Sequence, residues 1–342
     1  MEDVVPSGGW HVQDDGSPVS RVMYASRSTI RGSIYAEMER IRTSAMHHNV
    51  PTGVATALLY QSGWFTQWKE GPRDAVLGIM NRIALDPRHD SLRIIHSSEG
   101  ARLLSGPWSM AIVQCTDPPA DMAKRVDELA RELEQGRQHS PPGVWRRIST
   151  PMRHPGAARH ADPDAFQRVL VCAAAGTAPF ALVERLAQRY REEVVHRRFA
   201  GAQNLDIGTD YVDFAEGDRV LRVIAMARRG LTVPLTRAFL PDYSHIVLLL
   251  SGNRERDVAL LQRVAQGCAG LASSAPPLLG LARETAAHRE ISALARERGL
   301  RYLAAQGDAE EGCSCWETIR LHLDVAHQSA NSVWPAAQVR LG

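Results

Sequence analysis

The chain has little that would suit a membrane, a nucleic acid or a disulfide framework. Its 40 Lys and Arg residues nearly balance 38 Asp and Glu, and a net charge of +2 is too small for a nucleic-acid footprint. Its apolar runs, such as residues 246–250, are far shorter than a membrane span, and its first 18 residues lack a signal-peptide core. The five cysteines are odd in number and scattered along the chain, so they are a poor disulfide framework. We therefore expect a cytoplasmic protein without nucleic-acid or membrane partners.

Signatures of catalysis are also missing. We find no paired carboxylates, no nucleophile elbow and no nucleotide-cyclase or phosphodiesterase signature. Cys313 and Cys315, followed by His322 and His327, could ligate a soft metal, but their spacing matches no common zinc pattern and we expect no metal site. The sequence thus predicts that the chain is not an enzyme.

What is present is enough apolar sequence for two domains. Hydrophobic residues make up 44% of the 342 residues and charged residues 23%, as in soluble globular proteins. Two α/β blocks, 20–137 and 166–328, are separated by a Pro-, His- and Arg-rich stretch at 138–165, which we interpret as a linker. We expect residues 1–18 to be disordered and residues 329–342 to be a C-terminal tail.

The first block predicts the order βαββαββ, which is typical of a ferredoxin-like α+β layout with two helices on one face of a mixed sheet. Hydrophobic periodicity and turn residues predict the following elements: a strand at 21–26, a helix at 34–48, a hairpin of 54–60 and 64–68 around Ser62-Gly63, a helix at 74–85, and strands at 92–96 and 108–115. A trailing helix at 121–135 would cover the other face.

Gln67 is the most informative residue of this block. It lies in the aromatic second strand of the hairpin, just before a helix start. An amide carries both a donor and an acceptor, so a half-buried strand must supply partners for both. Tyr24 upstream and Trp108-Ser109-Met110 downstream extend this pattern.

Five short motifs occur at characteristic intervals along residues 20–115. They are Tyr24 with Ser26; His48-Asn49 at the end of the first helix; F-x-Q-x-x-E-G-P at 65–72; D-x-R-H at 86–89; and R-x5-W-S-M from Arg102 to Met110. Taken together, these motifs resemble those of the BLUF domain, a family of blue-light sensors that use FAD.

The resemblance implies a cofactor and a mechanism. FAD would be held by Tyr24, Ser26, His48, Asn49, Gln67, Asp86, Arg88, His89 and Met110. The photochemical switch would consist of Tyr24, Gln67, Trp108 and Met110. Tyr24 would donate an electron and then a proton through Gln67, whose changed hydrogen bond would readjust the strand carrying Trp108 and Met110. No substrate would be turned over.

Each of these residues alone also has an ordinary interpretation. Tyr24 could be a buried phenol, Gln67 a solvent-facing strand residue and Asn49 a helix C-cap. Trp108 and Met110 could be core residues on one strand face, and His89 a surface residue. Their joint spacing favours the flavin site.

Two positions depart from the family pattern. Thr56 stands where the family usually has glycine, which adds a β-branched side chain close to the flavin slot. Lys69 stands where the family has leucine, and it would have to reach out to solvent or meet a partner surface.

The second block predicts a doubly wound parallel sheet. The expected elements are strands at 168–172, 210–214, 220–226, 246–250, 277–282 and 302–305, and helices at 180–198, 255–266, 285–298 and 316–327. The order faintly resembles a small GTPase domain, and some other α/β domain is the alternative.

The nucleotide chemistry of that family is absent from the matching positions. Ala173, Ala178, Pro179 and Phe180 replace the two glycines, the lysine and the hydroxyl residue of the phosphate loop. Residues 227–230 replace D-x-x-G without its carboxylate, and no N-K-x-D motif lies near Leu281. We expect a degenerate, P-loop-GTPase-like docking module, a pseudo-GTPase.

The sequence thus predicts a blue-light photoreceptor that binds FAD and signals through residues 166–328 to a protein partner. Homo-oligomerisation stays open. The alternatives are a light-insensitive BLUF-like scaffold and an enzyme with an unrecognised C-terminal activity.

Overall fold

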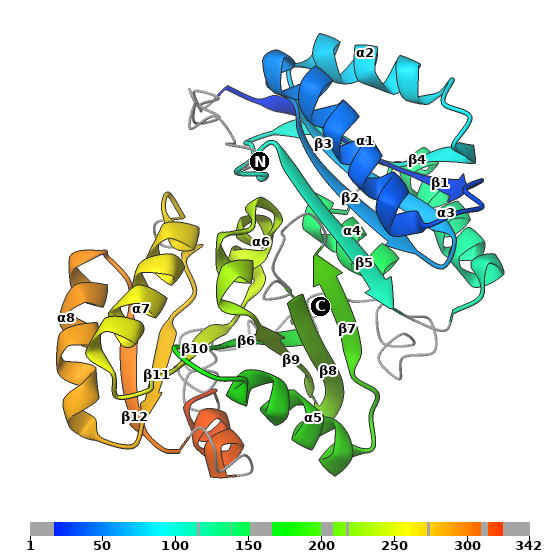
Figure 1. Cartoon of the computed structure of the whole chain (residues 1–342). Helices are drawn as coiled ribbons and strands as arrows, with labels where there is room; N and C mark the ends of the chain where they lie inside the picture. Colours follow the sequence, from blue (N-terminus) through cyan, green and yellow to red (C-terminus); the bar gives the residue numbers. More distant parts are fainter. Residues whose placement is uncertain are drawn as a thin grey trace, which may run out of the picture.

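One twelve-stranded sheet runs through the whole molecule, in the order β12-β11-β10-β6-β9-β8-β7-β5-β2-β3-β1-β4 (Figure 1). The computed structural model describes residues 17–114, 117–137, 139–150, 166–199, 208–216, 219–271, 274–308 and 314–323. The strands are β1 (Val19–Ser28), β2 (Ala55–Gln61), β3 (Trp64–Gly71), β4 (His89–Gly100), β5 (Trp108–Gln114), β6 (Phe166–Ala173), β7 (Val195–Phe199), β8 (Gly208–Glu216), β9 (Arg219–Met226), β10 (His245–Leu249), β11 (Leu278–Ala282) and β12 (Tyr302–Gln306).

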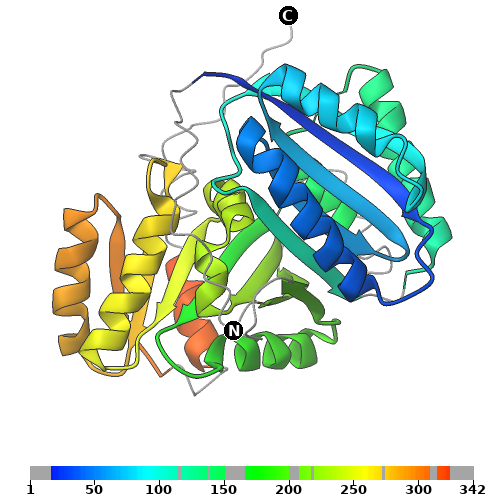
Figure 2. The same ribbon diagram turned by 45° about the horizontal axis from the view of Figure 1, so that its top comes forward.

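The first five strands form the predicted ferredoxin-like unit. The β2–β3 hairpin turns at Ser62 and Gly63, which both have positive φ angles (49° and 78°), as a tight two-residue turn requires. Helices α1 (Ile34–Asn49) and α2 (Arg73–Ile83) cover one face of these strands, and α3 (Pro119–Glu134) covers the other (Figure 2). The helices and strands predicted for residues 20–137 are therefore confirmed, with small shifts at their ends.

The second half has a parallel sheet with helices on both faces. Strands β9, β6, β10, β11 and β12 are parallel neighbours, and β8 adds antiparallel to β9. Helix α5 (Ala178–Tyr190) and a helix over 314–323 share a core on one face, whereas α7 (Arg254–Cys268) and α8 (His288–Glu297) pack on the other. The short helix α6 (Pro234–Phe239) was not predicted.

Strand β7 joins the two halves, and the sequence did not predict it. Residues 180–198 were expected to form one helix, but α5 ends at Tyr190 and Arg191 takes a left-handed conformation (φ 58°). Residues 195–199 then run antiparallel to β5, with Ala111 opposite Phe199 and Val113 opposite Arg197. The helical prediction is wrong because the strand partner of this segment lies more than 80 residues upstream in the chain.

Part of the predicted linker is folded core. Ser140 caps helix α4 (Pro141–Ser149) by accepting a hydrogen bond from the Gly143 amide, and proline suits the first helical position. Trp145 and Ile148 are buried against the core that contains α3. Residues 141–149 are therefore a helix, not a linker, because Pro-Pro-Gly directly after a capping serine starts a helix here.

Some predictions fall outside the described residues: the disordered segment up to residue 16, the remainder of the linker at 151–165, Cys115, Cys313, His327 and the tail at 329–342. Among the described cysteines, Cys172, Cys268 and Cys315 are buried free thiols. Within the described ranges, no helix is both long and apolar enough to cross a membrane.

Candidate functional site

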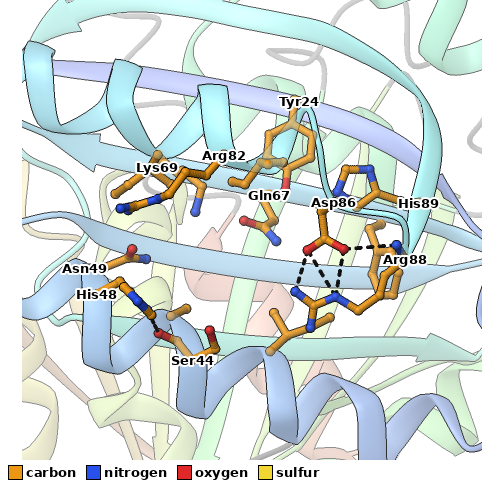
Figure 3. A pocket seen from close by; sticks show the side chains of 15 residues that line it. Tyr24, Ser44, His48, Asn49, Gln67, Lys69, Arg82, Asp86, Arg88 and His89 are labelled. Carbon is orange, nitrogen blue, oxygen red and sulfur yellow. Dashed lines mark hydrogen bonds and ion pairs between the residues drawn. The ribbon is translucent and has the colours of Figure 1, made fainter.

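A cleft of about 210 Å³ lies between α1 and α2, above β1 and β3 (Figure 3). Apolar side chains from both helices and from Phe65 form its walls. Its polar lining comes from Tyr24, Ser44, His48, Asn49, Gln67, Lys69, Arg82, Asp86, Arg88 and His89. Seven of the nine predicted cofactor residues line this cleft, all except Ser26 and Met110.

The register of the sheet places three of the four predicted switch residues in one row, whereas Trp108 lies opposite Thr56 in another row. Tyr24 pairs with Gln67, Gln67 with Leu58, and Leu58 with Met110, across strands β1, β3, β2 and β5. Side chains paired in this way point to the same face and touch their neighbours. The row therefore connects the cleft to the β5 strand through packed side chains.

Tyr24 and Gln67 are buried, with 1% and 8% of their surface exposed. Among the described residues, neither the Tyr24 hydroxyl nor the Gln67 amide has a hydrogen-bond partner, and both point into the cleft (Figure 3). Burial raises the pKa of Tyr24, so its phenol keeps its proton and can donate a hydrogen bond. Two unsatisfied polar groups at one place are what a bound ligand would satisfy.

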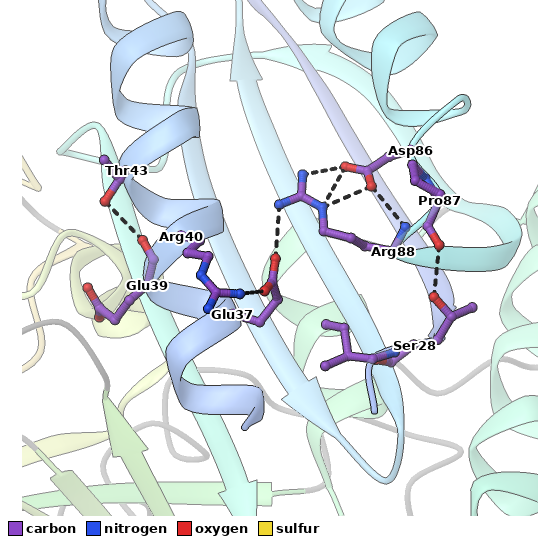
Figure 4. Close-up of polar contacts among 10 residues, drawn as sticks. Ser28, Glu37, Glu39, Arg40, Thr43, Asp86, Pro87 and Arg88 are labelled. Carbon is purple, nitrogen blue, oxygen red and sulfur yellow. Dashed lines mark hydrogen bonds and ion pairs between the residues drawn. The ribbon is translucent and has the colours of Figure 1, made fainter. Parts of the chain in front are cut away.

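At one end of the cleft, Asp86 and Arg88 form a tight ion pair (Figure 4). Arg88 Nε donates to both Asp86 carboxylate oxygens at 2.9 and 3.0 Å. Arg88 Nη1 donates to Glu37 Oε1 on α1 at 3.3 Å. The guanidinium group holds the pKa of Asp86 below its usual range. The ring of His89 lies 6.3 Å from that of Tyr24, and burial lowers the pKa of His89.

His48 lines the cleft from α1, where its side chain is exposed, and its Nδ1 is 2.7 Å from the Ser44 carbonyl oxygen. The remaining predicted residues lie outside the cleft lining. Ser26 is fully buried outside the cleft lining, on the Tyr24 face of β1. Met110 is buried with Met38, Leu58 and Phe65, and the half-buried Trp108 packs against the same cluster. Ser26, Trp108 and Met110 therefore lie outside the lining of the cleft.

The two departures from the family pattern contact each other. Lys69 is 1% exposed, and its Nζ donates to Thr56 Oγ1 at 3.3 Å. Asn49 Nδ2 donates to the same oxygen at 3.1 Å. The expectation that Lys69 reaches solvent or a partner surface is wrong, because direct cross-strand pairing of Thr56 with Lys69 supplies a buried acceptor. Sequence reasoning also missed Arg82, which lines the cleft from α2.

Comparison with known families resolves the nature of this unit. The family model described as sensors of blue-light using FAD matches residues 19–111. Residues 19–111 are a BLUF domain. The predicted FAD cofactor and the blue-light sensing function are confirmed at this level. The cleft suits a flavin, because it offers apolar walls together with the unpartnered Tyr24 hydroxyl and Gln67 amide at its floor.

The BLUF domain has enzyme-associated relatives. A photoactivated adenylate cyclase subunit beta from Euglena longa is 31% identical over 138 residues, which are 39% of this chain and 16% of the relative. The subunit of the same name from Euglena gracilis is 29% identical over 136 residues, 38% of this chain and 16% of the relative. A solved bacterial light-regulated adenylyl cyclase is 13% identical with a TM-score of 0.29, over 65% of this chain and 84% of that one.

These relatives correct one prediction. The expectation that the chain is not an enzyme is contradicted, since the proteins that share its BLUF domain are named as cyclase subunits. The chain spans about 16% of the length of these curated relatives.

Proposed function

We propose that the chain is a blue-light receptor whose BLUF domain passes a hydrogen-bond switch at Gln67 through β5 into residues 166–328. FAD, when bound, supplies the absorption of blue light. Tyr24, Ser26, His48, Asn49, Asp86, Arg88, His89 and Met110 form the surrounding site together with Gln67. The observation that carries this proposal is the row Tyr24, Gln67, Leu58 and Met110, which ends on β5.

The chain's own residues suggest how the switch works. Tyr24 keeps a proton that it can donate, and the adjacent Gln67 amide can exchange its donor and acceptor by rotation or tautomerisation. Each arrangement satisfies the amide with different partners, which makes the switch bistable. A changed Gln67 presses on Leu58 and then on Met110, so β5 shifts against β7.

A Gln67→Leu variant tests this mechanism. We expect it to retain flavin but to lose the red shift of the flavin absorption under blue light. The matched control is Gln61→Leu, which replaces another buried amide of the same hairpin outside the cleft. A Gln67→Leu protein that still photocycles would refute the proposed switch.

The C-terminal half supports two outputs. We propose that residues 166–328 form an α/β unit, joined to the BLUF domain by the pairing of β7 with β5, that is a degenerate GTPase-like docking module for a protein partner. A nucleotide-dependent activity is the second candidate. A cavity of about 930 Å³ lies at the carboxyl ends of β6, β10 and β11, where ligands bind in open α/β sheets. Its lining includes Thr177, Asp257 and Glu284.

The full chain distinguishes these outputs. We would measure binding of ATP and GTP, and formation of cyclic AMP, in darkness and under blue light. Light-dependent turnover would favour the enzymatic candidate. Light-dependent capture of a partner without nucleotide binding would favour the docking module.

A further inference from the structure

Lys69 is the one buried lysine of the molecule, and its amine group lies at the cleft. The sequence contains only two lysines, and the other, Lys124, is exposed on α3. Lys69 shares the acceptor Thr56 Oγ1 with Asn49, so an ammonium and an amide converge on one hydroxyl. A hydroxyl oxygen has two lone pairs, so it can accept both hydrogen bonds.

The described residues of this cleft include no carboxylate that pairs with the ammonium group of Lys69. The titratable groups of the same cleft are Tyr24 from β1, His48 from α1, Arg82 from α2, and Asp86, Arg88 and His89 from the segment that leads into β4. Asp86 is already paired with Arg88, and within the described ranges no carboxylate forms an ion pair with Lys69. Arg82 repels a charge on Lys69.

A buried ammonium without a counter-ion is costly, so it either loses its proton or finds negative charge in the cleft. Burial, with a smaller contribution from Arg82, lowers the pKa of Lys69 to about 7. Both protonation states are therefore accessible near neutral pH. A flavin gains negative charge when it is reduced, and this charge would stabilise the protonated ammonium group of Lys69.

We propose that Lys69, held by Thr56, is a positioning residue that supplies a titratable positive charge to the flavin site and raises the reduction potential of the bound flavin. This inference rests on the proposed flavin site in the cleft. The BLUF pattern has leucine at this position, so the charge is a property of this chain.

The test is a dark spectroelectrochemical titration of the flavin in the full chain between pH 5.5 and 9. At pH 6 we expect Lys69→Met to lower the ratio of reduced to oxidised flavin at a fixed potential at least tenfold, equivalent to about 30 mV for a two-electron couple. The difference in reduction potential between Lys69→Met and the unaltered chain should decrease toward pH 9, where Lys69 is neutral. Lys69→Arg should keep the high potential at all these pH values, and Lys124→Met should match the unaltered chain.

A second measurement follows the amine directly. With 13C-labelled lysine the protein gives two sets of side-chain signals, and Lys69→Met assigns them. We expect the Lys69 signal to titrate near neutral pH in the flavin-free protein and to shift when FAD is added. Colourless protein that cannot take up FAD would overturn the proposed flavin site. Bound flavin whose potential is the same in Lys69→Met and the unaltered chain would overturn only this inference.

Discussion

Ser109 Oγ accepts a hydrogen bond from the backbone amide of Leu235 at 3.2 Å, which ties β5 to helix α6 across 126 residues of sequence. Ser109 stands between Trp108 and Met110 but faces the opposite side of the sheet. One short strand therefore carries the BLUF switch residues on one face and a contact to the C-terminal half on the other. Because β5 contacts both halves, a movement of β5 must change contacts in both of them.

Replacement of Ser109 by alanine should weaken this connection. The variant leaves the buried Leu235 amide without its acceptor, which should lower the free energy of unfolding by about 1–3 kcal/mol. The flavin red shift should persist, whereas light-dependent hydrogen exchange in α6 should decrease. Ser97→Ala, which alters an exposed serine on β4, is the control. Unchanged exchange in α6 would show that the signal bypasses Ser109.

Gly106 packs against Pro234 of the C-terminal half. A Cβ atom at this position would lie 2.4 Å from Pro234 Cγ, so Gly106→Ala must displace α6 from β5. We expect a loss of about 1–3 kcal/mol in unfolding free energy, as for overpacking. Gly78→Ala on α2 meets no atom within 4 Å and should instead stabilise by about 0.5–1 kcal/mol. Equal effects in urea unfolding of the two variants would contradict this account.

Trp145 shows that helix α4 belongs to the core. It is 2% exposed and its ring lies 6.2 Å from that of Trp68 on β3. Trp145→Ala should cost about 3–5 kcal/mol, as for other large buried side chains. Thermal and urea unfolding measure this cost. A loss below about 1 kcal/mol would mean that residues 141–149 behave as a linker after all.

Lys69 should make the stability of the flavin-free protein depend on pH. Its folded-state pKa of about 7 lies below its ordinary 10.5, so the unfolded state binds more protons between these values and stability rises with pH. Lys69→Met should therefore stabilise the protein more at pH 6 than at pH 9, by about 1.4 kcal/mol for each pH unit between pH 7 and pH 9. Lys124→Met should leave the pH profile unchanged. If Lys69→Met raised the free energy of unfolding equally at pH 6 and pH 9, the lowered pKa of Lys69 would be refuted.

Local patterns were sufficient for much of the molecule. The Ser62-Gly63 turn, the helical stripe of α1 and the apolar run at β10 each specify their own conformation, so they could be predicted from neighbouring residues. Motif spacing likewise predicted that Tyr24, Gln67 and Asn49 share one cleft. Strand β7 and helix α4 could not be predicted in this way. Their apolar residues are few, and their stability depends on β5 and Trp68, which are distant in sequence.

The amino-acid sequence by itself determined the BLUF unit, because its motifs occur at characteristic intervals and local backbone preferences agree with the fold. Only the tertiary structure decided how Lys69 is accommodated and how the two halves are joined. The Lys69 partner is fixed by cross-strand register with Thr56, and the junction by the pairing of β5 with β7. Register and strand pairing bring distant residues together, and they depend on the balance of burial over the whole sheet rather than on any local pattern.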